Sequence, residues 1–196
     1  MKSAGRHARI YTPPVFLLLV SLLLPAGCAS FFDPGPAPLR LQLSVPMPER
    51  AAVQKKDKQI VVALPQAGRE LDSDGIALVF HGREIRYLAG ARWTNVSPNI
   101  VQRGIIDALE ASEAFRGVSD EMGGFAADLR LTTDLRAFSL EYADEDSAPV
   151  AHVAANFRVL DLRTGKVLGR KNIDATVAAA GRDNAALARA MEQALG

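Results

Sequence analysis

The chain contains a single cysteine, and this limits how its fold can be held together. Cys28 is the only thiol among 196 residues, so no disulfide can form within the chain. A zinc site built on several thiolates is excluded for the same reason. A domain of this chain therefore depends on an apolar core for its stability, and 48% of its residues are hydrophobic.

Cys28 directly follows a segment with the features of an export signal. Val15 to Leu24 is apolar apart from one serine, and a length of about ten residues suits a signal peptide, whereas a spanning helix needs about 20. Three basic residues precede this segment: Lys2, Arg6 and Arg9. The stretch that ends at Cys28 is similar to a lipobox, in which the cysteine is acylated and becomes the mature N-terminus, although Pro25 stands where lipoboxes usually carry leucine. The alternative is an ordinary secretory signal with a nearby cleavage site and an incidental thiol.

Cleavage before Cys28 would remove a signal peptide at 1–27 and leave 169 residues, enough for one domain with a core. The removed segment carries three basic residues and no acidic residue, so the formal net charge changes from +1 to −2. A nearly neutral surface of mixed charge lacks the basic patch by which nucleic acids are bound. With Cys28 acylated, the mature chain has no cysteine nucleophile either.

Residues 28–57 have the composition of a tether that follows the lipid anchor. Five of the chain's 11 prolines lie in this segment, at positions 34, 36, 38, 46 and 48. Proline-rich segments are stiff and extended, at about 3.1 Å per residue, so this one can lift a domain from a membrane. Within it, apolar residues alternate with polar ones over 39–45, which predicts a half-buried first strand at an edge of the domain's sheet.

Residues 58–196 contain the patterns of one further domain. Strands are predicted at 60–64, 76–80, 84–88, 129–142, 153–159 and 167–177. Turns at 81–83 and 163–166 join two pairs of these strands as hairpins. The apolar residues of 129–142 change from odd to even positions, which predicts a bulge near Arg136.

Two amphipathic helices are predicted between and after these strands. The first begins with Ser97 as its N-cap and Pro98 at its first helical position, and it ends near Ser112. Asp183 caps the second, in which apolar residues recur at helical spacing as far as Leu195. The order of strands, helix, strands and helix predicts an α+β domain, with a single mostly antiparallel sheet and two amphipathic helices packed on one face.

The sequence offers little material for catalysis. Two histidines remain after export, His81 in a predicted turn and His152 in a predicted strand, and each is interpreted as a surface or hydrogen-bonded side chain. No Gly-x-Ser-x-Gly motif is present. A hydrolase that uses Ser97 or Ser139 with a histidine stays open as an alternative. We expect no cofactor and no metal site, since the acidic turn at 72–75 lacks the later ligands of a calcium loop.

Trp93 lies between a predicted strand and the first predicted helix, and it has two interpretations. A lone tryptophan at such a junction most often packs in the core. Tryptophan is also enriched among the residues that dominate binding at protein interfaces, so a partner-binding role for Trp93 is the alternative.

An ordered set of short motifs links these elements to a known family. The set begins with Arg86-Tyr87-Leu88, Ala91-Arg92-Trp93, Ser97-Pro98 and Phe115-x-x-Val118. It continues with Ala127 to Leu131, Ala155 to Asp161 and Thr164-Gly165. Together with the lipobox, the set resembles the ABC-type transport auxiliary lipoproteins, the PqiC/YmbA-like partners of Mce-domain lipid transport systems, over nearly the whole mature chain.

The resemblance implies a non-enzymatic accessory subunit. Its partners would be an Mce-domain periplasmic protein and an ABC permease and ATPase in the inner membrane, which together move phospholipids or other hydrophobic molecules across the envelope. The domain would dock on this assembly from its lipid anchor, and homo-oligomers are compatible with that role. The alternative is a structural envelope lipoprotein that assists an outer-membrane complex without transporting lipid.

The residues after Cys28 indicate which membrane holds the anchor. Ala29 and Ser30 follow it, and neither is the aspartate that commonly retains lipoproteins at the inner membrane. We therefore expect anchoring at the periplasmic face of the outer membrane of a Gram-negative cell.

Replacing Cys28 by serine should abolish anchoring. Each buried acyl CH₂ contributes about 0.8 kcal/mol, so the several chains of a mature lipoprotein hold it firmly on a membrane. Cell fractionation should find the Cys28→Ser protein either as an unprocessed precursor or released from the membrane fraction. Acylation at Cys28 is refuted if this variant fractionates with membranes and migrates on a gel like the wild type.

Overall fold

The computed structural model describes residues 36–45, 55–124 and 126–196. The chain divides into two units, 1–37 and 38–196, and all of the described helices and strands belong to the second unit. Cys28 and the predicted signal peptide at 1–27 lie outside the described residues. The strand expected at 39–45 is present as β1 (Leu39–Leu41), which is shorter than expected and pairs with the domain's sheet at one edge, as predicted.

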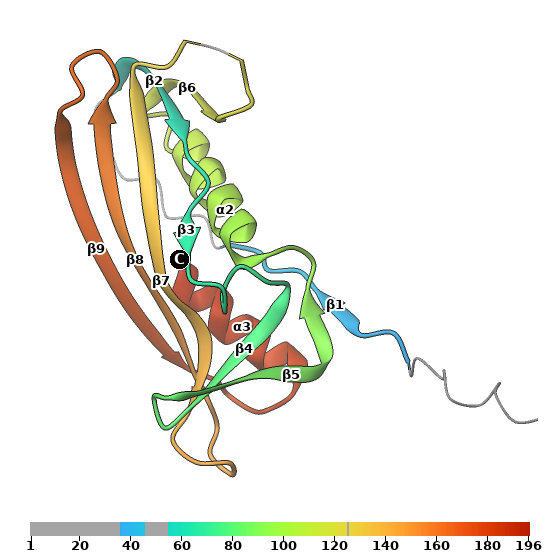
Figure 1. Cartoon of the computed structure of the whole chain (residues 1–196). Helices are drawn as coiled ribbons and strands as arrows, with labels where there is room; N and C mark the ends of the chain where they lie inside the picture. Colours follow the sequence, from blue (N-terminus) through green and yellow to red (C-terminus); the bar gives the residue numbers. More distant parts are fainter. Residues whose placement is uncertain (1–35, 46–54, 125) are drawn as a thin grey trace, which may run out of the picture. The chain divides into compact units, whose positions relative to one another are not determined.

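Among the described residues, the second unit forms a nine-stranded sheet with two helices (Figure 1). After β1 the strands are β2 (Lys56–Val62), β3 (Gln66–Ala67), β4 (Gly75–Phe80), β5 (Glu84–Trp93), β6 (Phe115–Asp120), β7 (Leu129–Tyr142), β8 (Val150–Asp161) and β9 (Val167–Ala178). The helices are α2 (Ser97–Ala111) and α3 (Asn184–Leu195). The predicted α+β class is confirmed, while β3 and β6 have no counterpart among the predicted strands.

The sheet is assembled around β7. One edge of β7 pairs antiparallel with β8 along nearly its whole length, and β8 pairs antiparallel with β9. The other edge is shared by β2, β3 and β4, which meet successive parts of β7 and all run parallel to it. The sheet is therefore mixed: antiparallel pairing dominates the long β7–β8–β9 part and the β4–β5 hairpin, and the short strands pair in parallel.

The predicted bulge and both predicted hairpin turns are confirmed. The register of β7 against β8 shifts between Leu135 and Ala137, and Arg136 is the exposed extra residue. In the β4–β5 turn the Arg83 N–H donates to the Phe80 carbonyl at 3.0 Å, and the two residues between them, His81 and Gly82, both have positive φ, at 50° and 67°, as in turns whose twist matches a hairpin. Gly165 supplies a φ of 69° in the β8–β9 turn.

The helix starts confirm one predicted cap and correct the other. Asp183 caps α3, because its carboxylate accepts hydrogen bonds from the backbone N–H groups of Ala185 and Ala186, both at 3.0 Å. Ser97 does not cap α2: it is the first helical residue, and Val96 is the N-cap without a side-chain bond. The Ser97 side chain is buried in the protein instead, and its backbone N–H donates to the carbonyl of Ser73 at 3.3 Å.

Both helices cover the same face of the sheet, where the core lies (Figure 1). The larger cluster packs α3 against β4, β5, β7 and β8, and its most buried members include Trp93, Phe138, Leu140, Leu187 and Met191. The smaller cluster packs α2 against β2 and the first part of β7, through Ile60, Val62, Ile106, Leu129 and Leu131. The opposite face of the sheet, called the outer face below, carries no helix among the described residues.

Trp93 belongs to this core. It ends β5 with 1% of its surface exposed, and its indole meets the ring of Phe138 edge to face, with the ring centroids 5.9 Å apart. Its indole N–H is buried without a hydrogen-bond acceptor, so the ring is held by packing alone.

Truncating Trp93 should therefore destabilise the domain strongly. We expect Trp93→Ala to lower the free energy of unfolding by about 3–5 kcal/mol, measured by denaturant titration, because the cavity removes the contact with Phe138. Trp93→Phe keeps a ring and removes an unpaired N–H. Its loss in the free energy of unfolding should therefore be smaller than that of Trp93→Ala by at least about 1 kcal/mol. Ile85→Ala, on the exposed part of the same strand, is the control and should stay within about 1 kcal/mol of the wild type. Equal stability of Trp93→Ala and Ile85→Ala would contradict the core assignment.

Candidate functional site

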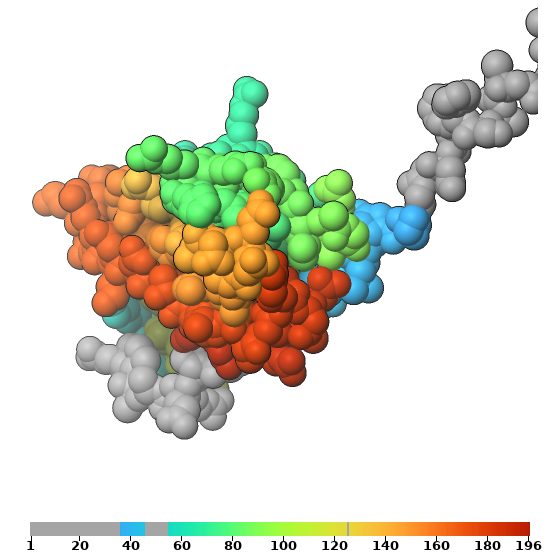
Figure 2. Space-filling view, turned by 90° about the horizontal axis from the view of Figure 1, so that it is seen from below, coloured from blue at the N-terminus to red at the C-terminus, as the bar shows by residue number. Residues whose placement is uncertain are grey.

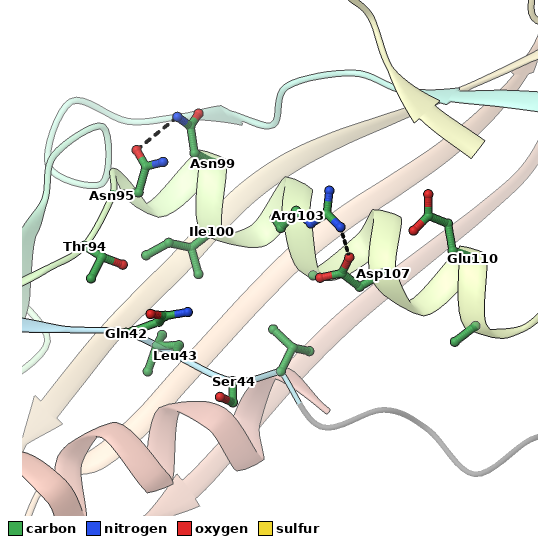
Figure 3. A pocket seen from close by; sticks show the side chains of 13 residues that line it. Gln42, Leu43, Ser44, Thr94, Asn95, Asn99, Ile100, Arg103, Asp107 and Glu110 are labelled. Carbon is green, nitrogen blue, oxygen red and sulfur yellow. Dashed lines mark hydrogen bonds and ion pairs between the residues drawn. The ribbon is translucent and has the colours of Figure 1, made fainter. Parts of the chain in front are cut away.

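A groove of about 640 Å³ lies between α2 and the N-terminal segment at 42–45 (Figure 3). Its polar side chains come from α2 and from the residue two positions before it, at positions spaced four apart, which lie on one side of a helix. They are Asn95, Asn99, Arg103 and Asp107, with Glu110 one turn further on. Asn99 donates its amide to the Asn95 carbonyl oxygen at 3.0 Å, and Arg103 pairs with Asp107 at 2.5 Å.

The segment at 42–45 is held between the two helices. The Ser44 N–H donates to the carboxylate of Glu192 on α3 at 2.8 Å. On the other side Val45 packs against α2 at Gly104, where a Cβ would come within 2.8 Å of a Val45 methyl group. The glycine is therefore what allows the segment to approach α2. Figure 2 shows the segment 38–45, in blue, at the surface beside green and red parts of the domain.

Asp74 ties β1 to the rest of the sheet. Its carboxylate accepts hydrogen bonds from Arg40 of β1 at 2.6 Å and from Arg92 of β5 at 2.8 Å. The hydrogen bonds from Arg40 and then Arg92 hold the pKa of Asp74 below its ordinary value. The acidic turn at 72–75 thus anchors an N-terminal strand through ion pairs, which the local sequence did not indicate.

His152 lies in a polar cluster on the outer face. Its Nδ1 is 2.6 Å from a carboxylate oxygen of Glu141 on β7, and its Nε2 is 3.0 Å from one of Asp174 on β9. Burial alone would lower the pKa of His152, but the hydrogen bonds and charges of the two carboxylates outweigh that effect and raise the pKa above its ordinary value. The sequence predicted a surface or hydrogen-bonded side chain, and the structure shows a partly buried ring hydrogen-bonded at both nitrogens.

The structure gives the serine–histidine alternative no support. Ser139 pairs directly with His152 across β7 and β8, but both ring nitrogens of His152 are directed at carboxylates rather than at a hydroxyl. Ser97 is buried at the start of α2, and His81 is exposed in the β4–β5 turn. Within the described ranges no group of histidine, cysteine, aspartate and glutamate side chains is arranged to hold a metal ion.

The remaining predicted site residues are placed as follows. Trp93 is in the core, so its ring offers no surface to a partner in this conformation, and the core interpretation is the one that its burial supports. Cys28 lies outside the described residues, and its acylation stays a prediction. No helix in the described part of the chain is both long and apolar enough to cross a bilayer.

Comparison with known proteins identifies the family. Residues 41–196 match the family model described as ABC-type transport auxiliary lipoprotein component. The chain belongs to this family. The match includes β1's last residue, the whole sheet and both helices, so the expected family is confirmed over nearly all of the second unit.

Solved structures agree with the fold. Protein XCC0632 from Xanthomonas campestris, assigned to DUF330, is 26% identical with a TM-score of 0.73, covering 80% of this chain and 87% of that one. An uncharacterized protein shares the fold at 9% identity, with a TM-score of 0.63 over 82% of this chain and 92% of that one. No curated protein sequence matches.

The stability of this auxiliary lipoprotein should depend on the ionisation of His152. Its pKa is raised on folding from an ordinary value of 6.5, so its contribution is complete below that value and is lost as pH rises through the folded pKa. We expect the free energy of unfolding to fall as the pH rises above the ordinary value of 6.5, measured by denaturant titration at each pH. His152→Gln should flatten this part of the profile, whereas the control His81→Gln should keep it. An unchanged profile for His152→Gln would show that the two carboxylates do not stabilise the charged ring.

Proposed function

We propose that this protein is a lipid-anchored accessory subunit of an Mce-type ABC transport system, which moves phospholipids or other hydrophobic molecules across the cell envelope. It acts by docking on its partners rather than by catalysis. In this proposal 1–27 is the signal peptide, Cys28 carries the anchor at the periplasmic face of the outer membrane, 28–57 is the tether and 58–196 is the auxiliary domain.

The family match over residues 41–196 is the observation that supports an accessory role. Two features of the described residues support docking: the arrangement of their reactive side chains and the polar lining of their hollows. Their histidines, serines and acidic side chains do not converge on a nucleophile with a free base. Their hollows are open and lined by amide, guanidinium and carboxylate groups, which suit recognition through hydrogen bonds.

The open edge of β9 is the docking surface we favour. β9 is a 12-residue strand that pairs only with β8 among the described strands, so its far edge presents unpaired backbone groups. A partner can extend such an edge by adding a strand of its own, with the backbone supplying the hydrogen bonds. Arg170 and Lys171 stand next to each other on β9, and their like charges discourage two copies from pairing edge to edge.

The attachment of β1 supports a tethered mode of action. Arg40 binds Asp74 and also donates to the carbonyl of Trp93 at 3.0 Å, so β1, the strand within the tether, is fastened to β5. These contacts would keep β1 paired with β5 when tension acts on the tether.

Photocrosslinking in cells tests this proposal. A benzoylphenylalanine replaces either Leu168 or Thr176, both exposed on β9, in the full-length chain, and the crosslinked proteins are identified by mass spectrometry. We expect an Mce-domain protein to crosslink from both positions. Asp146, exposed in the β7–β8 loop, is the matched control position and should capture much less of it.

Two outcomes would count against the proposal. Crosslinks only to an outer-membrane complex, with no component of a transporter, would favour the structural envelope lipoprotein instead. Equal capture of the Mce-domain protein from Asp146 and from β9 would keep the partner but refute docking at this edge. Separating the two membranes on a density gradient before crosslinking also tests the outer-membrane location.

A further inference from the structure

The outer face of the sheet contains a hollow of about 600 Å³ over β7, β8 and β9. Strand register places its side chains in rows, because residues directly opposite each other on paired strands point to the same face. One row joins Thr132 of β7, Arg158 of β8 and Arg170 of β9. The neighbouring row joins Arg130, Leu160 and Val167 on the same three strands. Three guanidinium groups thus line one hollow.

Two of these arginines have no acidic partner. Arg158 and Arg170 stand opposite each other on adjacent strands, and neither makes an ion pair with any described residue. Like charges at directly opposed positions destabilise a sheet, since the Cβ atoms are only about 5 Å apart. The fold therefore keeps a repulsive pair that an anion between them would neutralise.

The third arginine leaves a donor unused. Arg130 pairs with Glu121 through one terminal nitrogen, but its Nε is buried without an acceptor. The acidic groups of the hollow are already engaged: Glu121 with Arg130, and Asp134 with Arg136 at 3.7 Å and with the Asn156 amide at 3.3 Å. The charge left over in the hollow is positive, and its free donors include those of the arginines and the buried hydroxyl of Thr133, which has no hydrogen-bond partner.

Exposed aliphatic side chains border the same hollow. Leu64, which follows β2, is 49% exposed, and Val167 at the start of β9 is 42% exposed. Leu160 lies between Arg130 and Val167 in their shared row. An apolar border next to unpaired guanidinium groups matches a molecule that has both an anionic and an apolar part.

We propose that this hollow binds the phosphate headgroup of an anionic amphiphile, with Arg158 and Arg170 holding the phosphate and Leu64 and Val167 contacting the start of the apolar chains. Guanidinium groups bind phosphate with paired, charge-assisted hydrogen bonds, and a hollow of this volume holds one small ligand rather than a membrane surface. The inference rests on the proposed function, because a lipid transport system is what would present such a molecule to the domain.

An acidic segment of a partner protein is the competing occupant, and the aliphatic border argues against it. A carboxylate-rich peptide would use the arginines and leave Leu64 and Val167 in water. A phosphate-bearing amphiphile uses both groups at once. The comparison of three soluble probes can therefore separate these occupants.

The test is isothermal titration of the full-length lipidated protein in uncharged maltoside micelles, with blank titrations into micelles alone. The probes are dihexanoyl phosphatidylglycerol, inorganic phosphate and hexaglutamate. We expect the phosphatidylglycerol probe to bind at least about tenfold more tightly than either of the others. The double variant Arg158→Gln/Arg170→Gln should lose about tenfold or more of that affinity, because each lost charge-assisted hydrogen bond is costly. Arg69→Gln, an exposed arginine in the β3–β4 loop, is the matched control and should bind like the wild type.

Further variants check the two halves of the site. Leu64→Ser/Val167→Ser should weaken the phosphatidylglycerol probe and leave inorganic phosphate unaffected. The double arginine variant should melt no lower than the wild type, because it removes a repulsive pair; a loss of affinity in a folded protein then reports on binding alone.

Several results would overturn the inference. They are equal affinity for phosphatidylglycerol and inorganic phosphate, tighter binding of hexaglutamate, no binding of the lipid probe, or binding that the double arginine variant retains. Failure here is distinguishable from failure of the proposed function. A protein that crosslinks to the Mce-domain partner from β9 but does not bind the probe keeps its accessory role and lacks this site.

Discussion

The fold depends on β7, a strand of 14 residues that uses both of its edges. Its three short parallel neighbours, β2, β3 and β4, have between two and seven residues each and gain their places by pairing with it. Both core clusters also lie on its helix-covered face. That face stays continuous because the bulge at Arg136 returns the side chains to phase, so Leu135 and Phe138 are both buried.

Local signals account for the part of the fold that the sequence predicted. Glycine-containing turns specified the two hairpins, the change of phase specified the bulge, and Asp183 specified a helix start, all within a few residues of each feature. The parallel pairing of β2, β3 and β4 with β7 depends on contacts between segments up to about 70 residues apart. The alternation of apolar and polar residues predicts which face of a strand is buried, but it does not predict which strands are neighbours in the sheet. β3, with two residues, is too short to show a period.

The same limit applies to the candidate sites. The sequence predicted that His152 is a surface or hydrogen-bonded side chain, but it could not name Glu141 and Asp174, which lie on two other strands. Asp74 was recognised as part of an acidic turn, while its binding of Arg40 and Arg92 needed the register of β1 against β5. Arg158 and Arg170 are ordinary exposed residues of alternating strands until β8 and β9 are paired, and only that register sets one opposite the other.

The two faces of the sheet differ in the side chains they carry. The helix-covered face holds the apolar clusters, including Trp93 and Phe138, so changes there act first on stability. The outer face and the edge of β9 carry charged and exposed side chains whose removal leaves the core intact. In our proposals recognition uses the outer face and the edge of β9, so a variant there that keeps its stability but loses a ligand or a partner reports on binding. The Arg158–Arg170 pair fits the proposed phosphate site, because an anion held between two opposed like charges would offset their repulsion.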